Sequence, residues 1–469
     1  MKMNYSLNFE DLQYQAVPLP EEILKMKWSG NFDKAREMIN HRLTLDLPKA
    51  YRARLMIELK NLNHMEEGYS LSREDALAQV RAEIPDFTEE EFEERIMNGK
   101  LEWIFLNGKM MFYVSTIRNM LRTSPELWPR MGGDPKAKVV NVMDAVIENL
   151  KDGDRMHGVI HVRHELKMNP DALVPGKNLH VYLPVPVERQ QIHNLEILEI
   201  TPTPTRMPQV EDVQPTAYFE LPAEADQVFA VEYKFDNFVD YIDMANIDFD
   251  AVAAAEYPED VKVYLEERGP HILFTPYLRA LAEELKGDET HPVKIARRFY
   301  DYITTQLAYS FVRDYSAIDS IAEYTAIRRQ ADCGAQGLLF ITLCRIAGIP
   351  ARWQSGLETA PNDVGEHDWA QFYVPTIGWV YCDPSFGMSA YLRGQMKKWD
   401  FYFGNLDPFR CPLNCDVQYD FVPPKKFIRM DICDNQDGEM EYDDYGLYNN
   451  DYKRTFIDKG IHLVEPMVP

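Results

Sequence analysis

The sequence predicts an α+β fold in which a helix bearing a cysteine packs on an antiparallel sheet. Helical periodicity dominates residues 1–150 and returns from residue 237, whereas short strand-like runs fill residues 151–236. A cysteine at the start of an apolar helix is then followed by a β-hairpin pattern. We therefore expect a mainly helical N-terminal domain (1–150), a β-sandwich domain (151–236), a core domain with the cysteine helix (237–400) and a C-terminal extension (401–469).

Capping residues and one turn signal mark the elements of the N-terminal domain. Asn31, Ser72 and Thr88 each precede an amphipathic or acidic run and are good N-caps. The acids that follow Ser72 and Thr88 suit the positive end of a helix dipole. Asn107 and Gly108 lie between two aromatic runs and predict a β-hairpin, because both turn positions need a positive φ angle.

The β-sandwich domain is predicted from short runs that prolines and polar clusters separate. The runs are residues 159–166, 179–184, 195–200, 217–221 and 228–235. His157, His161 and His164 lie in or beside the first run. His161 and His164 fall on opposite faces of a strand, so we interpret the three as surface residues and not as a metal site.

The acidic composition limits the possible partners. The chain has 75 acidic and 50 basic residues, which gives a net charge of −25. Such a surface repels nucleic acid and anionic membranes, so we expect neither as a partner. No run approaches the ~20 apolar residues of a membrane span, and the first residues lack the apolar stretch of a secretory signal. We expect a soluble, cytoplasmic protein, although a signal peptide removed beforehand would leave the same sequence.

All six cysteines lie in the last third of the chain. Cys411, Cys415 and Cys433 are candidate zinc ligands, but a closed structural site needs four ligands, and Cys-x-x-Cys spacing is absent. We expect free thiols or one optional disulfide at these positions, and neither a metal nor a cofactor.

Cys333 begins a helix whose two ends are marked in the sequence. Asp332 is a good N-cap, Gly348 suits the left-handed C′ position, and Pro350 prevents continuation of the helix. Cys333 therefore lies in the first turn, where the helix dipole and free N–H groups favour a thiolate and stabilise an oxyanion. An isolated cysteine is more often a small buried residue, and this interpretation holds for Cys344, deeper in the same helix.

The β-hairpin pattern places His367 at the start of its first strand and Asp383 at the end of its second. Both ends lie at one edge of the hairpin, so the carboxylate is expected to bond one imidazole nitrogen while the other faces a thiol. A register centred on Pro375 would make His367 and Asp383 direct partners. We then expect a thiolate–imidazolium pair of Cys333 and His367, with a lowered cysteine pKa.

These blocks resemble the transglutaminase-like superfamily, which includes transglutaminases, related bacterial cysteine proteases and peptide N-glycanases. The resemblance spans about residues 290–390 and rests on Gly348-Ile-Pro-Ala-Arg352, His367-Asp-Trp369, Gly378-Trp379 and Asp383-Pro384. It implies a papain-like transglutaminase core preceded by a sandwich domain. It further implies Cys333 as the nucleophile, His367 as the base and Asp383 as the residue that orients the histidine.

The resemblance also implies an oxyanion donor upstream of the cysteine. Tyr309 stands where such proteins often carry a tyrosine, and Gln330, three residues from Cys333, is a competitor by residue type. The chain departs from the usual pattern at Asp332, near a common glycine position, and at Asp368, where alanine is usual. The extra carboxylate at position 368 either raises the pKa of the adjacent histidine or points away along the strand.

The implied activity is thiol-dependent acyl transfer on amide substrates through a thioester. Cys333 attacks the amide carbonyl, and His367 protonates the leaving amine and then activates the second nucleophile. We favour water, hence a protease or deamidase acting on a protein or peptide, because no sequence feature specifies an amine site. The alternatives are a cross-linking transglutaminase, a catalytically retired binding module and a papain-like protease, although the Gly378-Trp379 strand argues against the last. The sequence does not set the oligomeric state.

Overall fold

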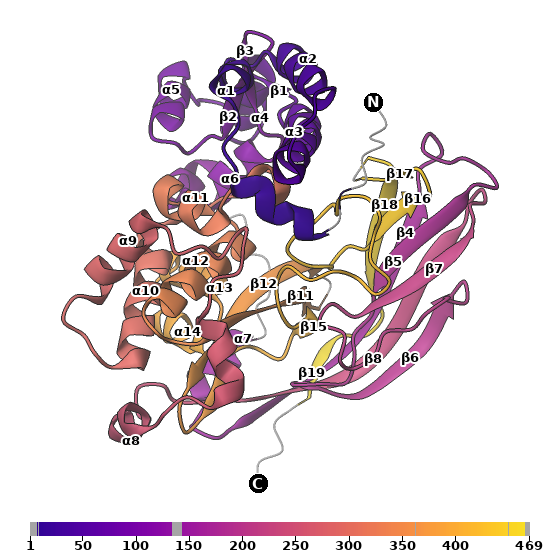
Figure 1. The fold of residues 1–469 in the computed structure, drawn as a ribbon. Coiled ribbons are helices and arrows are strands. Elements are labelled where there is room, and N and C mark those ends of the chain that lie inside the picture. Colours follow the sequence, from indigo (N-terminus) through magenta and orange to yellow (C-terminus); the bar gives the residue numbers. More distant parts are fainter. Residues whose placement is uncertain (1–6, 8, 134–142, 362, 449, 465–469) are drawn as a thin grey trace.

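The fold combines helices with mostly antiparallel sheets, which confirms the predicted α+β class (Figure 1). The computed structural model describes residues 7, 9–133, 143–361, 363–448 and 450–464. Along the chain, a helical N-terminal region precedes two sheets that form a sandwich, and these precede helices packed on another sheet. None of the described helices is long and apolar enough to cross a membrane.

The N-terminal region combines helices with a small sheet of order β1-β3-β2. Its elements are η1 (Phe9–Ala16), α1 (Glu21–Trp28), α2 (Phe32–Leu43), α3 (Lys49–Gly68), β1 (Leu71–Ser72), α4 (Arg73–Glu83), α5 (Glu89–Met97), β2 (Trp103–Leu106), β3 (Lys109–Phe112), α6 (Thr116–Arg122) and η2 (Pro125–Met131). The side chains of Asn31, Ser72 and Thr88 cap α2, α4 and α5 as predicted, each accepting a backbone N–H at 3.1 Å. Asn107 and Gly108 form the predicted hairpin turn with φ angles of 51° and 75°.

The sandwich contains a strand at each of the predicted runs and further strands from the end of the chain. Helix α7 (Met143–Asn149) precedes β4 (Arg155–Met168), β5 (Asn178–Pro184), β6 (Ile192–Thr201), β7 (Thr216–Pro222) and β8 (Val228–Asp240). The late strands are β16 (Glu439–Tyr442), β17 (Tyr445–Gly446), β18 (Tyr452–Asp458) and β19 (His462–Val464). One sheet has the order β17-β16-β5-β7, and the other has the order β18-β4-β8-β6 with β19 also paired to β4. The C-terminal extension therefore completes both sheets (Figure 1), while the four domain boundaries stay a prediction.

The surface interpretation of the three histidines is wrong for one of them. His164 on β4 is 1% exposed and packs against Phe456 of β18. His157 and His161 are partly exposed and bond carboxylates of β8. His164 is buried because β18, which lies almost 300 residues later, pairs with β4 and covers its side chain.

The core packs helices on a sheet of order β14-β13-β12-β11-β15, whose two edge strands lie beyond residue 400, in the predicted C-terminal extension. The elements before the cysteine are α8 (Phe249–Ala254), η3 (Glu259–Leu265), α9 (Pro276–Lys286), α10 (Pro292–Gln306), β9 (Ala308–Tyr309), η4 (Tyr315–Ala317), α11 (Ile321–Arg328) and β10 (Gln330–Ala331). Then come α12 (Cys333–Ile346), β11 (Ala351–Ala360), β12 (Asp363–Val374), β13 (Gly378–Cys382), α13 (Pro384–Leu392), α14 (Met396–Phe401), β14 (Phe403–Gly404) and β15 (Arg410–Asn414). Phe340 of α12 meets Phe372 of β12 with ring centroids 5.8 Å apart, so the cysteine helix lies on the sheet as predicted.

The predicted hairpin is present, but its predicted register is wrong. Val374 pairs with Gly378, which centres the turn on Thr376 and not on Pro375. Thr376 takes a left-handed φ of 75°, and this conformation fixes the turn one residue later. As a result Asp383 lies just beyond the paired part of β13 and diagonally across from His367.

Candidate active site

Cys333 is the first residue of α12, and its helix is capped as predicted. The Asp332 side chain accepts a hydrogen bond from the Ala335 N–H at 3.1 Å. Gly348 has a φ of 79°, the left-handed conformation expected where the helix ends. Cys333 therefore lies in the first turn of α12, where backbone N–H groups lack partners within the helix and the helix dipole favours negative charge.

His367 and Asp383 form a buried pair. His367 Nε2 lies 2.8 Å from Asp383 Oδ2, and the other oxygen of Asp383 accepts the Phe386 N–H at 3.0 Å. Arg410 of β15, which the sequence did not single out, contacts the same Oδ2 at 3.1 Å and is fully buried. Burial alone would raise the pKa of Asp383, but His367 and Arg410 outweigh it, so this pKa is lowered. The carboxylate is therefore held in its charged form beside the imidazole.

The contact to the Cys333 sulfur comes from Asp368. Cys333 Sγ lies 3.3 Å from Asp368 Oδ2, and among the described residues no hydrogen bond joins this sulfur to His367. Successive side chains of a strand point to opposite faces, which separates His367 from Asp368 on β12. The extra carboxylate thus faces the thiol. Neither alternative derived from the sequence, a raised pKa of His367 or a side chain that points away along the strand, places it there.

This contact reverses the expected shift of the cysteine pKa. Burial raises the pKa of Cys333 well above its ordinary value, and the nearby carboxylates of Asp368 and Asp332 raise it further. The pKa of Asp368 is also raised well above its ordinary value, first by burial and then by other carboxylates. In this structure the sulfur is therefore a thiol that donates to a carboxyl group, and not a thiolate paired with imidazolium.

Two tyrosines lie near the cysteine. Tyr309 reaches the site because β9 pairs in parallel with β10, two residues before Cys333. Tyr315 of η4 donates its hydroxyl to Asp332 Oδ1 at 2.5 Å, a contact that no sequence pattern indicated. The competitor Gln330 donates instead to the backbone carbonyl of Gly99 in the N-terminal region. Of the two candidates, Tyr309 is the one beside the cysteine helix.

A segment of the C-terminal extension lines the same region. Gln436 Nε2 donates to Asp368 Oδ1 and also to the His367 carbonyl oxygen at 3.3 Å. Asp434 Oδ2 accepts from Gln436 at 3.1 Å and from the Trp353 indole at 3.2 Å. Sequence reasoning missed Asp434 and Gln436, because they lie about 50 residues beyond the last recognised motif.

The cysteines considered as zinc ligands are free thiols, as are the other three. Cys411 and Cys433 are buried and Cys415 is partly exposed. Within the part of the chain that the structure describes, no group of three or more His, Cys, Asp or Glu side chains has the arrangement of a metal site.

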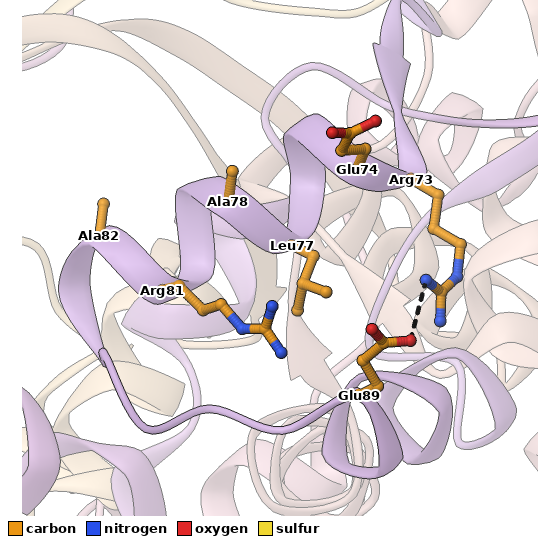
Figure 2. A pocket seen from close by; sticks show the side chains of 7 residues that line it. All are labelled: Arg73, Glu74, Leu77, Ala78, Arg81, Ala82 and Glu89. Carbon is orange, nitrogen blue, oxygen red and sulfur yellow. Dashed lines mark ion pairs between the residues drawn. The ribbon is translucent and has the colours of Figure 1, made fainter.

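A hollow of about 720 Å³ lies on α4, in the N-terminal region (Figure 2). It is lined by Arg73, Glu74, Leu77, Ala78, Arg81, Ala82 and Glu89. Figure 2 shows the ion pair between Arg73 and Glu89, 3.6 Å long, at its rim. No residue predicted for the active site lines this hollow.

Comparisons with known proteins find a family match within the core. Residues 279–384, which include Cys333, His367 and Asp383, match the model of the Transglutaminase-like superfamily. A solved structure of a putative cysteine protease from Cytophaga hutchinsonii is 15% identical, with a TM-score of 0.40, and the match covers 66% of this chain and 92% of that chain. The periplasmic domain of TgpA from Pseudomonas aeruginosa is 16% identical, with a TM-score of 0.28, over 54% of this chain and 94% of that chain. None of the curated proteins matches the sequence.

Proposed function

Since residues 279–384 form a transglutaminase-like core, we propose that this chain is a cysteine-dependent enzyme that hydrolyses amide bonds of a protein or peptide. One observation carries the proposal. A single matched segment holds Cys333 at the start of a helix and a buried His367–Asp383 pair with Nε2 and Oδ2 2.8 Å apart. A nucleophile at a helix start and an imidazole oriented by a carboxylate are the parts that acyl transfer requires.

The proposed reaction forms and then hydrolyses a thioester. The Cys333 thiol loses its proton to a base of the site as its sulfur attacks the amide carbonyl carbon, and the C–N bond breaks as the nitrogen takes a proton from the protonated His367. His367 then takes a proton from water, whose oxygen displaces the sulfur from the acyl carbon, and the released sulfur regains its own proton from the base. Asp383 keeps the imidazole in one orientation through both steps. The approach of His367 to the reacting atoms belongs to the substrate complex, since such contacts often tighten only there.

The oxyanion of each tetrahedral intermediate needs hydrogen-bond donors. We assign this role to the free N–H groups of the first turn of α12 and to the Tyr309 hydroxyl. Burial, followed by the nearby Cys333 and Asp332, raises the pKa of Tyr309 well above its ordinary value. The hydroxyl therefore keeps its proton and remains a donor.

The test measures turnover on a mixture of unmodified peptides. Cleaved peptide bonds are identified by mass spectrometry, released ammonia is quantified, and incorporation of a fluorescent primary amine is followed in parallel. We expect cleavage or ammonia release that disappears in Cys333→Ser and in His367→Ala. Cys344→Ser is the matched control, because Cys344 is buried deeper in the same helix.

Three results would count against the proposal. Amine incorporation faster than hydrolysis would replace it by cross-linking activity. Equal turnover in wild type and Cys333→Ser would exclude the nucleophile. If no peptide yields any of the three products while some peptides bind to the protein, the binding module is favoured.

A further inference from the structure

Asp368 lies in close contact with the proposed nucleophile, Cys333. Its Oδ2 is 3.3 Å from Cys333 Sγ, and its Oδ1 accepts a hydrogen bond from Gln436. A Cβ atom added at Gly334, the residue after the cysteine, would lie 2.7 Å from Asp368 Oδ2. The glycine therefore leaves the space in which this carboxyl group meets the start of α12.

Building on the proposed function, we propose that Asp368 and Cys333 share a single proton, and that Asp368 takes the thiol proton as the nucleophile forms. The S–H bond breaks, an O–H bond forms at Oδ2, and the electron pair stays on sulfur for attack on the carbonyl carbon. When hydrolysis of the thioester releases the sulfur, the proton returns to it. Asp368 is thus a catalytic residue that sequence comparison would not select, since alanine is usual at this position of the family pattern.

The charges around the pair favour one shared proton. Asp332 caps the cysteine helix, and Asp431 and Asp434 approach from the C-terminal segment. After burial itself, these three carboxylates are what raises the pKa of Asp368. Two negative charges 3.3 Å apart in a buried site repel strongly, so the thiolate and the carboxylate cannot both be charged near neutral pH. The pair therefore holds one proton over a wide pH range and titrates as a unit.

The other groups that face the pair do not replace Asp368 as the proton acceptor. Burial, followed by the neighbouring carboxylates, raises the pKa of Tyr315 and Cys433 well above their ordinary values, so both stay neutral. Tyr309 is neutral for the same reason. His367 is held by Asp383 and, among the described residues, makes no hydrogen bond to the sulfur, and the cation Arg429 binds Glu439 at 2.9 Å. Asp368 is the base in contact with sulfur.

The test is the rate of Cys333 alkylation by iodoacetamide in the full-length protein between about pH 4.5 and about pH 10, read by peptide mass spectrometry. In wild type the shared proton keeps a constant fraction of thiolate, so the rate should rise at acid pH and then stay level through neutrality. In Asp368→Asn the rate should rise about tenfold per pH unit up to the thiol pKa. The two curves should cross, with wild type faster at acid pH and Asp368→Asn faster at alkaline pH, where it lacks the repelling charge.

Two further variants test the origin of the effect. His367→Ala should keep the level region, because the imidazole does not hold the thiol proton. Asp434→Asn should keep it and move its acid edge to lower pH, because loss of a neighbouring carboxylate lowers the pKa of Asp368. If Asp368→Asn fails to fold, as judged by circular dichroism and urea unfolding, the test rests on the acid edge of the alkylation profile in Asp434→Asn. An edge at the same pH as in wild type overturns the proposal.

The outcomes separate this proposal from the proposed function. A wild-type profile in Asp368→Asn, or a level region lost in His367→Ala and kept in Asp368→Asn, overturns the shared proton but leaves the enzyme proposal standing. Cys333 that reacts no faster than the buried Cys344 at every pH, together with absent turnover, overturns both.

Discussion

At the scale of single residues, neighbouring positions of β12 bond to groups from different parts of the chain. His367 pairs with Asp383 across the hairpin, whereas Asp368 meets Cys333 and Gln436. The residues proposed as the triad follow from short motifs, because each motif marks a local element such as a helix start or a strand end. Gln436 carries no such mark, and its contact with β12 depends on where a distant segment of the chain returns.

The variant Asp383→Asn is predicted to distinguish the role of Asp383, which orients His367, from the role of Asp368, which holds the thiol proton. An amide cannot balance an imidazolium, so we expect turnover to fall by about 10²–10⁴ with the fold retained, by analogy with other catalytic triads. Alkylation of Cys333 at neutral pH should change less than about threefold, because Asp368 holds the thiol proton. Peptide turnover and iodoacetamide rates measured on the same preparation check both statements. A parallel loss of the two rates would mean that His367, and not Asp368, controls the thiol.

At the scale of elements, those with local sequence signals are predicted, whereas the late strands β16 to β19, which carry no such signal and join strands far away in sequence, are not. Caps such as Asn31 and Asp332 lie within three residues of the N–H groups that donate to them, so the sequence alone reveals them. The β12–β13 hairpin was predicted for the same reason. Its predicted register is wrong because it places two functional residues opposite each other, whereas the left-handed Thr376 sets the turn.

Helix α12 depends on a glycine for its approach to the sheet. A Cβ atom at Gly334 would lie 2.4 Å from Tyr315 Oη and 2.9 Å from the Trp353 ring. We expect Gly334→Ala to cost about 1–3 kcal/mol in the free energy of unfolding and to slow Cys333 alkylation, because the helix start must move away from Asp368. Gly365→Ala on β12 is the matched control, since its added Cβ would meet no atom within 4 Å. Urea unfolding of both variants measures the difference, and equal stabilities would contradict the close packing.

At the scale of the whole molecule, regions far apart in sequence meet beside the active site. Lys60 of α3 is buried and donates to Ser316 Oγ at 3.1 Å and to the Arg429 carbonyl oxygen at 2.7 Å. Gln15 donates to the Ser316 carbonyl oxygen at 2.6 Å. The N-terminal region, the core and the C-terminal extension are thus joined at η4. Hydrophobic periodicity cannot predict such contacts, because they depend on buried polar groups that are hundreds of residues apart.

At the same scale, two buried histidines, His164 and His271, are predicted to lower the stability of the fold on acidification. Burial lowers the pKa of each from its ordinary 6.5 to about 3, so the folded state excludes a proton that the unfolded chain binds. Their stabilisation is complete above pH 6.5 and falls below it by about 1.4 kcal/mol per histidine and pH unit. The buried carboxylates of Asp368 and Asp431 act in the opposite sense, because their raised pKa values favour the protonated folded state.

The variant His271→Leu removes one histidine titration and leaves these carboxylates unchanged. Between about pH 7.5 and about pH 5, the free energy of unfolding of this variant relative to wild type should therefore shift by about 2 kcal/mol in the variant's favour. Urea unfolding at both pH values measures this shift. A difference between His271→Leu and wild type that is the same at both pH values would show that the buried imidazole does not titrate on unfolding.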